Sequence, residues 1–99
     1  MGNKAQAAIG LCARAGKLAS GDSPCEHALQ RGKAFMILLD GEASANTVAK
    51  YEAKCVHYGT PLRVIKGVAA AAGKPGRMVF AVIEEGFFRM IQDALASGN

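Results

Sequence analysis

One short stretch of the chain combines basic side chains with glycines, which is the combination that a phosphate-binding surface needs. Four cations lie between residues 14 and 33 with only two acids among them, and glycines stand at positions 16, 21 and 32. The cations are Arg14, Lys17, Arg31 and Lys33. Glycine lets the backbone approach a ligand closely, and the free N–H groups at a helix start attract anions. The stretch predicts phosphate contact, although a plain strand-turn-helix corner with solvated lysines explains the same residues equally well.

The overall charge favours the same chemistry. The 99 residues include 12 Lys and Arg against 8 Asp and Glu, which gives a net charge of +4. A second basic run, formed by Lys66, Lys74 and Arg77, contains no acid. Clustered positive charge attracts polyanions. Charge and its distribution therefore favour a nucleic acid as the partner.

The residue types that perform catalysis or bind metals form no recognisable constellation. Cys55 and His57 are half of a metal site, and no second pair stands at ligand spacing. Cys25 and His27 would point about 200° apart on a helix, so they cannot act as a nucleophile and its base. No glycine-rich passage has the spacing of a nucleotide-binding loop. We therefore expect no enzyme activity, no metal and no cofactor.

Cysteine usage and hydropathy indicate the compartment. The three cysteines, at positions 12, 25 and 55, are an odd and widely spaced set, which is typical of reduced thiols in a cytosolic protein. No window approaches the roughly 20 apolar residues of a membrane span, and the first ten residues lack the apolar segment of a secretory signal. We expect one cytoplasmic domain covering residues 1–99, monomeric and without membrane contact, because the length suits a single core.

Local signals in the first third of the chain predict two helices with an extended piece between them. Apolar residues recur at helical spacing over residues 4–15, and Gly16 ends that helix. Residues 17–20 are extended. Ser23 as the cap, Pro24 at the first helical position and Glu26 three residues after the cap predict a second helix over residues 24–31.

The rest of the chain alternates apolar strands with helices. Residues 34–39 are one apolar run, which predicts a strand buried on both faces, and Ser44 to Thr47 supply caps for a helix ending near Gly59. Further strands are expected at 62–65 and 78–83, and further helices at 66–72 and 87–95. This order predicts a three-layer α/β/α sandwich around a mixed sheet of about four strands. Most of the aromatic side chains fall on core stripes, so no stacking platform for bases is indicated.

Several short motifs occur in a characteristic order. They are Gly10-Leu11-Cys12-Ala13-Arg14-Ala15-Gly16-Lys17-Leu18, Ser20-Gly21, Ala28-Leu29-Gln30-Arg31-Gly32-Lys33-Ala34, Ala43-Ser44-Ala45-Asn46-Thr47, Gly59-Thr60-Pro61-Leu62 and Val79 to Phe87. In order and spacing they resemble the kink-turn RNA-binding ribosomal-protein family, and more narrowly its bacterial YlxQ-like branch. The resemblance covers nearly the whole chain.

The resemblance implies an α/β/α sandwich that grips a sharply bent RNA. The RNA-binding elements would be the glycine turn, the helix start that follows it and a loop after the third strand. Together with the basic stretch, this makes the candidate RNA-binding residues Gly16, Lys17, Gly21, Asp22, Ser23, His27, Arg31, Lys33, Val64 and Lys66. The expected partner is a structured RNA, ribosomal or messenger, with the ribosome or ribosome-associated proteins as further partners.

Three positions depart from the pattern of the family. RNA-binding members typically carry Asn, Glu and, three residues later, Lys where this chain has Ser23, Pro24 and His27. Proline offers neither a polar side chain nor an N–H, and losing a bidentate base contact costs on the order of 1–3 kcal/mol of discrimination. One hypothesis is therefore RNA binding through phosphate contacts and shape. The other is an adaptor that kept the fold, lost kink-turn recognition and binds proteins.

Overall fold

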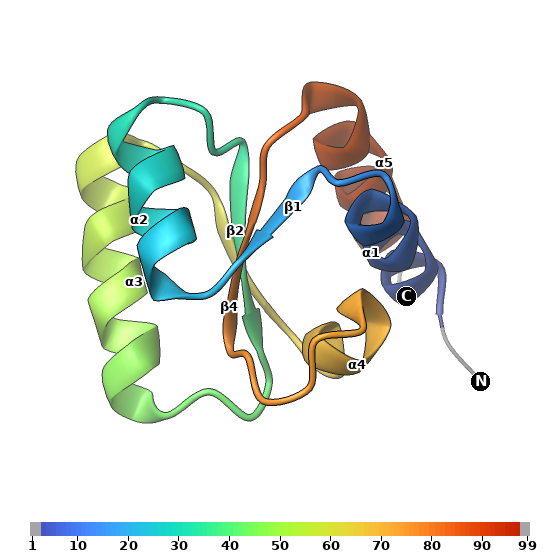
Figure 1. Ribbon diagram of the computed structural model, residues 1–99, viewed down its shortest axis with the longest axis horizontal. Coiled ribbons are helices and arrows are strands. Elements are labelled where there is room, and N and C mark those ends of the chain that lie inside the picture. The colour runs from blue at the N-terminus through green and yellow to red at the C-terminus, as the bar shows by residue number, and fades with distance from the viewer. Residues whose placement is uncertain (1–2, 98–99) are drawn as a thin grey trace.

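The protein is a four-stranded sheet covered by helices on both faces, as a computed structural model that describes residues 3–97 shows (Figure 1). In chain order the elements are α1 (Lys4–Arg14), β1 (Leu18–Ser20), α2 (Asp22–Gln30), β2 (Met36–Asp40), α3 (Ala45–Tyr58), β3 (Leu62–Ile65), α4 (Val68–Ala72), β4 (Val79–Val82) and α5 (Glu85–Ala96). Helices α2 and α3 cover one face, and α1, α4 and α5 cover the other. The expected three-layer α/β/α sandwich with a mixed sheet is confirmed.

The strand order is β1-β4-β2-β3, so the last strand of the chain lies between β1 and β2. Strands β2 and β3 are parallel, whereas β4 is antiparallel to both of its neighbours. Consequently β1, β2 and β3 all end at one edge of the sheet, where β4 begins. We call this the carboxyl edge, and we call the opposite edge, where β1, β2 and β3 begin, the amino edge.

The two central strands carry the core on both of their faces. Alternate residues of β2 and β4 pack toward α1, α4 and α5, and the intervening ones pack toward α2 and α3. All eight of these side chains are at most 3% exposed: Met36, Ile37, Leu38, Leu39, Val79, Phe80, Ala81 and Val82. A strand buried on both faces has a continuous apolar sequence. The expectation of a strand buried on both faces is therefore confirmed for Met36 to Leu39.

Helix ends follow the local signals in two places. Gly16 adopts a φ of 73° just after α1, and the Lys17 N–H donates to the Cys12 carbonyl at 3.0 Å, which closes the helix as expected. At the start of α3 the Ser44 hydroxyl accepts a hydrogen bond from the Thr47 N–H at 3.1 Å. No helix within residues 3–97 is both long and apolar enough to cross a bilayer.

The start of α2 differs from the expectation. The cap is Gly21 rather than Ser23, and the helix begins at Asp22. Gly21 has a φ of 99°, a conformation that glycine adopts without strain, so the chain turns directly from β1 into the helix. The Gly21 carbonyl accepts from the Cys25 N–H at 3.1 Å, which leaves Ser23 exposed within the first turn.

Phe35 also differs from the expectation, which placed it inside a buried strand. Strand β2 begins one residue later, and 37% of Phe35 is exposed. The Phe35 N–H donates to the Val82 carbonyl at 2.8 Å, and its ring stacks on Phe88 with centroids 6.3 Å apart. An aromatic side chain is therefore exposed at the amino edge.

Candidate nucleic-acid interface

The residues that the sequence singled out lie at both edges of the sheet. Helix α2 runs back across the sheet after β1, so roughly 13 Å of helix separates its two ends. Gly21, Asp22, Ser23, Val64 and Lys66 lie toward the carboxyl edge, where β1 and β3 end. Gly16, Lys17, Arg31 and Lys33 lie at the amino edge, and His27 is exposed on α2 between them. The stretch from Gly16 to Lys33 is thus two surfaces joined by α2, not one continuous edge.

The turn at Gly21 is the most constrained part of the carboxyl edge. Its N–H donates to the Val79 carbonyl at 2.9 Å, which fixes the turn against the start of β4. A Cβ atom at this position would lie 2.6 Å from Nη1 of Arg77. The guanidinium of Arg77 therefore lies directly against a backbone that carries no side chain.

Arg77 was not among the candidate residues. The sequence showed it only as a member of a basic run, about 55 residues away from Gly21. Its position depends on β4 pairing antiparallel with β1, which brings the residues just before β4 to the turn after β1. Two local features of the sequence indicated that Arg77 could bind an anion. Residues 74–76 have the composition of a turn, and the basic run contains no acid.

The two acids of the basic stretch face α3. The Tyr51 hydroxyl donates to Oδ1 of Asp22 at 2.6 Å, and Lys50 Nζ lies 3.4 Å from the same atom. Glu26 forms ion pairs with Lys50 at 3.4 Å and with Lys54 at 3.7 Å. These acids are neutralised on the α3 side, away from the cations of the stretch.

The pKa values of Asp22 and Tyr51 are shifted in opposite directions. The hydrogen bond from Tyr51, helped by the charge of Lys50, holds the pKa of Asp22 below its usual value. Burial, together with the carboxylate of Asp22, raises the pKa of Tyr51 far above its usual value. Both shifts keep the phenol protonated and the carboxylate ionised at neutral pH, so the link between α2 and α3 is intact there.

The cations of the stretch are available to a ligand. Within the described part of the chain, no ion pair involves Lys17, Arg31, Lys33 or Arg77. Arg14 folds back along α1, where its Nη1 would lie 3.4 Å from a Cβ at Gly10. These four cations are therefore not paired with acids of the described chain.

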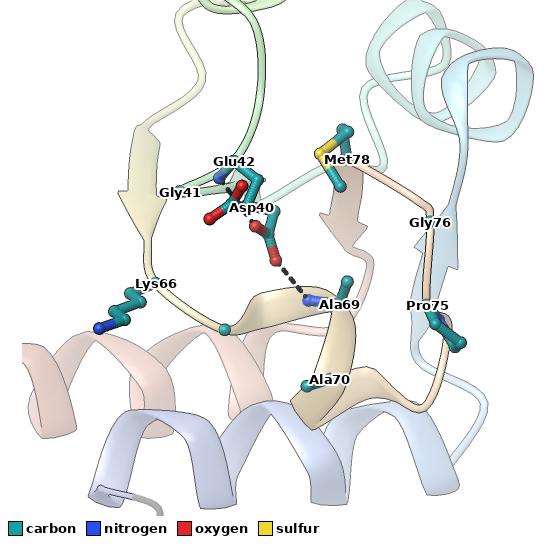
Figure 2. Close-up of a pocket in the computed structure, with 10 residues that line it drawn as sticks. Asp40, Gly41, Glu42, Lys66, Ala69, Ala70, Pro75, Gly76 and Met78 are labelled. Carbon is teal, nitrogen blue, oxygen red and sulfur yellow. Dashed lines mark hydrogen bonds between the residues drawn. The ribbon is translucent and has the colours of Figure 1, made fainter.

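A hollow of about 620 Å³ opens beside the end of β3 (Figure 2). Asp40 closes its inner wall, accepting hydrogen bonds from the Ala69 N–H at 2.9 Å and the Glu42 N–H at 2.8 Å. Figure 2 shows the side chain of Lys66 extending outward from this wall. Its carbonyl is fixed by Nε2 of Gln6 at 2.8 Å. The predicted residue Val64 is 51% exposed on the edge strand β3.

The cysteines are core residues. Cys12 and Cys25 are fully buried and Cys55 is 4% exposed. Burial raises the pKa of Cys25 to about 12 and that of Cys12 to about 11, with smaller contributions from Asp22 and Glu84 respectively. A thiol held protonated is a poor nucleophile. Residues 3–97 also contain no cluster of three potential metal ligands.

The chain is a small α/β/α sandwich protein. Its strand order is β1-β4-β2-β3, and a glycine turn beside an arginine follows β1. A solved structure of a protein of unknown function from Bacillus halodurans has this fold, with a TM-score of 0.88 and 30% identity over 96% of this chain and 99% of that one. The Giardia lamblia 15.5kD RNA binding protein shares the fold alone, with a TM-score of 0.76 and 14% identity over 93% of this chain and 82% of that one.

Sequence comparison identifies the family. The RNA-binding protein YlxQ of Bacillus subtilis is 34% identical over 82 residues, which are 80% of this chain and 82% of that protein. The RNA-binding protein YlxQ of Enterococcus faecium is 32% identical over 95 residues, which cover 93% of this chain and 91% of that one. No protein-family model matches the chain. This chain belongs to the YlxQ family.

Proposed function

We propose that this chain is a cytosolic RNA-binding protein that contacts structured RNA, ribosomal or messenger, through the carboxyl edge. The observation that carries the proposal is the guanidinium of Arg77, which lies against the bare backbone of Gly21 and has no ion pair among the described residues. The relatives are named RNA-binding proteins, which supports the same function.

The geometry favours phosphate contact over base reading. A phosphate oxygen can approach the turn closely because Gly21 has no side chain, and Arg77 presents a planar fork that matches phosphate oxygens. Lys66 adds a second cation from the end of β3. Ser23 and Pro24, two exposed residues of the first α2 turn, offer one hydroxyl for bases, whereas the exposed Asp22 accepts a hydrogen bond from Tyr51. We therefore propose recognition of RNA shape, with weak discrimination among sequences.

A titration at several salt concentrations tests this function. The probe is a fluorescent RNA hairpin of about 30 nucleotides with a three-nucleotide bulge. If about three cations neutralise phosphates, the logarithm of the affinity should fall with the logarithm of salt at a slope of about −2 to −3. Arg77→Gln should weaken binding several-fold, whereas Arg63→Gln, an exposed cation on β3, should not. Absence of binding at 100 µM protein would refute the proposal.

A second candidate function is that of a protein-binding adaptor on the ribosome. It is favoured by a hollow of about 440 Å³ between α1 and α5, where Leu11 and Met90 are 46% and 44% exposed. The test is ribosome association after nuclease treatment. Retention that is lost in Leu11→Glu with Met90→Glu, but kept in Arg77→Gln, would support the adaptor over the RNA-binding protein.

A further inference from the structure

We propose that the amino edge is a second RNA-binding site, where an unpaired base stacks on Phe35 while adjacent phosphates contact Arg31 and Lys33. The proposal rests on the RNA-binding function proposed above and assigns it a second, single-stranded segment of the RNA. This surface lies at the opposite end of α2 from Gly21 and Arg77.

A hollow of about 520 Å³ marks the site. Its polar and aromatic lining consists of His27, Arg31, Lys33 and Phe35, and no acid is among its lining residues. The hollow at the carboxyl edge differs, because Asp40 and Glu42 line it. The volume of the amino-edge hollow falls in the range of pockets that hold small ligands. An exposed aromatic ring bordered by cations is the combination that binds single-stranded nucleic acid.

Main-chain hydrogen bonds fix the backbone of the turn that carries the two cations. Gly32 adopts a φ of 69°, and the Lys33 N–H donates to the Ala28 carbonyl at 2.9 Å. The Gly32 N–H donates to the Leu29 carbonyl at 3.1 Å, which completes a glycine-terminated helix end. The last carbonyls of a helix carry about half a negative charge, and two full positive charges outweigh it. The turn after α2 therefore attracts anions despite the polarity of the helix.

Phe35 is held in a fixed orientation while part of it stays open. Its N–H is bound to Val82, and its ring lies at 27° to the ring of Phe88. The remaining exposure of 37% is available for a base to stack on. Because the ring is already ordered, stacking costs little side-chain entropy.

Neighbouring acids are occupied elsewhere. Glu26, on α2, is bound by lysines of α3. Glu84 caps α5 by accepting from the Phe87 N–H at 2.8 Å, and Glu85 forms an ion pair with Arg89 at 2.8 Å. The backbone of Lys17 is attached to the same edge, since its carbonyl accepts from the Ile83 N–H at 3.0 Å. Positive charge therefore dominates this edge, which fits a polyanion.

The exposed surface of α2 can connect the two edges. His27 lines both the amino-edge hollow and a second hollow that includes Ser23 and Gln30. The roughly 13 Å length of α2 corresponds to about four nucleotides at the 3.4 Å spacing of stacked bases. An RNA whose folded part contacts Arg77 can therefore reach Phe35 with a short single-stranded tail.

The experiment compares three fluorescent RNAs with the whole protein: the bulged hairpin, the same hairpin with a tail of ten uridines, and ten uridines alone. The variants are Arg31→Gln with Lys33→Gln, and Phe35→Leu, which keeps an apolar side chain over Phe88. The first variant should bind the tailed hairpin no more tightly than the untailed one. It should also lower the slope of log affinity against log salt by about 1.4. Phe35→Leu should weaken binding of tailed RNA roughly five-fold or more. Neither variant should alter binding of the untailed hairpin.

A matched control has the same change in charge. Lys4→Gln with Arg63→Gln also removes two exposed cations, neither of which lines the amino-edge hollow, and it should leave the tail effect intact. Crosslinking through 4-thiouridine in the tail should label the peptide that contains Phe35. Thermal unfolding followed by circular dichroism confirms that each variant is folded.

The outcomes separate the two proposals. Equal binding of tailed and untailed hairpins, with no binding of ten uridines, overturns the second site and leaves the carboxyl edge standing. Binding of ten uridines that depends on Arg31 and Lys33, without hairpin binding, supports the second site and overturns the carboxyl edge. Loss of both bindings overturns both. Decaglutamate serves as a competitor for the uridine tail. If it displaces the tail and binds the protein with the same affinity as ten uridines, the partner is an acidic protein and the RNA assignment is overturned.

Discussion

The hydroxyl of Tyr51 donates a 2.6 Å hydrogen bond to Oδ1 of Asp22, joining the buried interior of α3 to the first residue of α2. The contact fixes the helix that follows the Gly21 turn, and it turns a carboxylate away from the cations. Its strength depends on the ionisation of Asp22, because an ionised acceptor makes the stronger bond. The stability of the protein should therefore respond to this single contact in a pH-dependent way.

Tyr51→Phe should lower the free energy of unfolding by about 1 kcal/mol at pH 7. The pKa of Asp22 is lowered in the folded protein, so its contribution is present above the unfolded value of 3.8 and is lost as pH falls through the folded value. The difference between the two proteins should shrink at pH 3. Urea unfolding at both pH values measures it. Tyr58→Phe, at an exposed ring of the same helix, is the control. A difference that stays constant with pH would contradict the assignment.

Gly21→Ala should cost about 2–3 kcal/mol, because the backbone conformation at this position is nearly exclusive to glycine. The added methyl would also displace the guanidinium of Arg77, so RNA affinity should fall. Gly59→Ala is the matched control, since Gly59 also has a positive φ, of 67°. A methyl group added at Gly59 would have no atom within 4 Å apart from those of the adjacent residues. It should cost about 1 kcal/mol and leave RNA binding unchanged. Equal effects of both variants on RNA would argue against the role of Arg77.

Asp40→Ala should lower the free energy of unfolding by about 3 kcal/mol, because two N–H groups lose a charged acceptor and the Ala69 amide is buried. Amide hydrogen exchange should accelerate at Ala69, reporting the loosening of α4. Asp40→Asn retains one acceptor and should cost about half as much. Glu42→Ala, at an exposed position, should change neither measurement. Unchanged exchange at Ala69 in Asp40→Ala would contradict the anchoring role.

The native thiols should react slowly with iodoacetamide at pH 8. With a pKa of about 11, Cys12 carries on the order of one thousandth of its thiol as thiolate at that pH, and Cys25 carries less. Burial also blocks the reagent, so modification should follow opening of the structure. In 6 M urea all three cysteines should react at the rate of a model thiol. Rapid labelling of the folded protein, located by peptide mass spectrometry, would contradict this prediction.

The sequence predicted those parts of the fold that local chemistry determines. Gly16 ends its helix through a backbone conformation that the residue type allows, and Ser44 caps α3 with its own hydroxyl. The run from Met36 to Leu39 is apolar because both faces of β2 are covered. In each case the determining contacts lie within a few residues of one another, so the pattern of residue types was sufficient.

The site was less predictable because its geometry depends on contacts between distant segments. Arg77 meets Gly21 through the antiparallel pairing of β1 with β4, which no local pattern specifies. Phe35 had the residue type and neighbours of a core strand, and its exposure reflects where β2 begins against Val82. Ser23 carried a capping signal that Gly21 overrode, because the turn out of β1 requires a positive φ.

The position of β4 has a consequence for how the chain folds during translation. In the described sheet, β1 has β4 as its only neighbour, and about sixty residues separate Ser20 from Val79. Such distant pairing slows folding, since a long loop must close before the contact forms. The first strand therefore stays unpaired until β4 has been synthesised and has left the ribosome. A nascent chain that stalls before residue 79 would expose the apolar faces of β2 and would depend on chaperones to remain unaggregated.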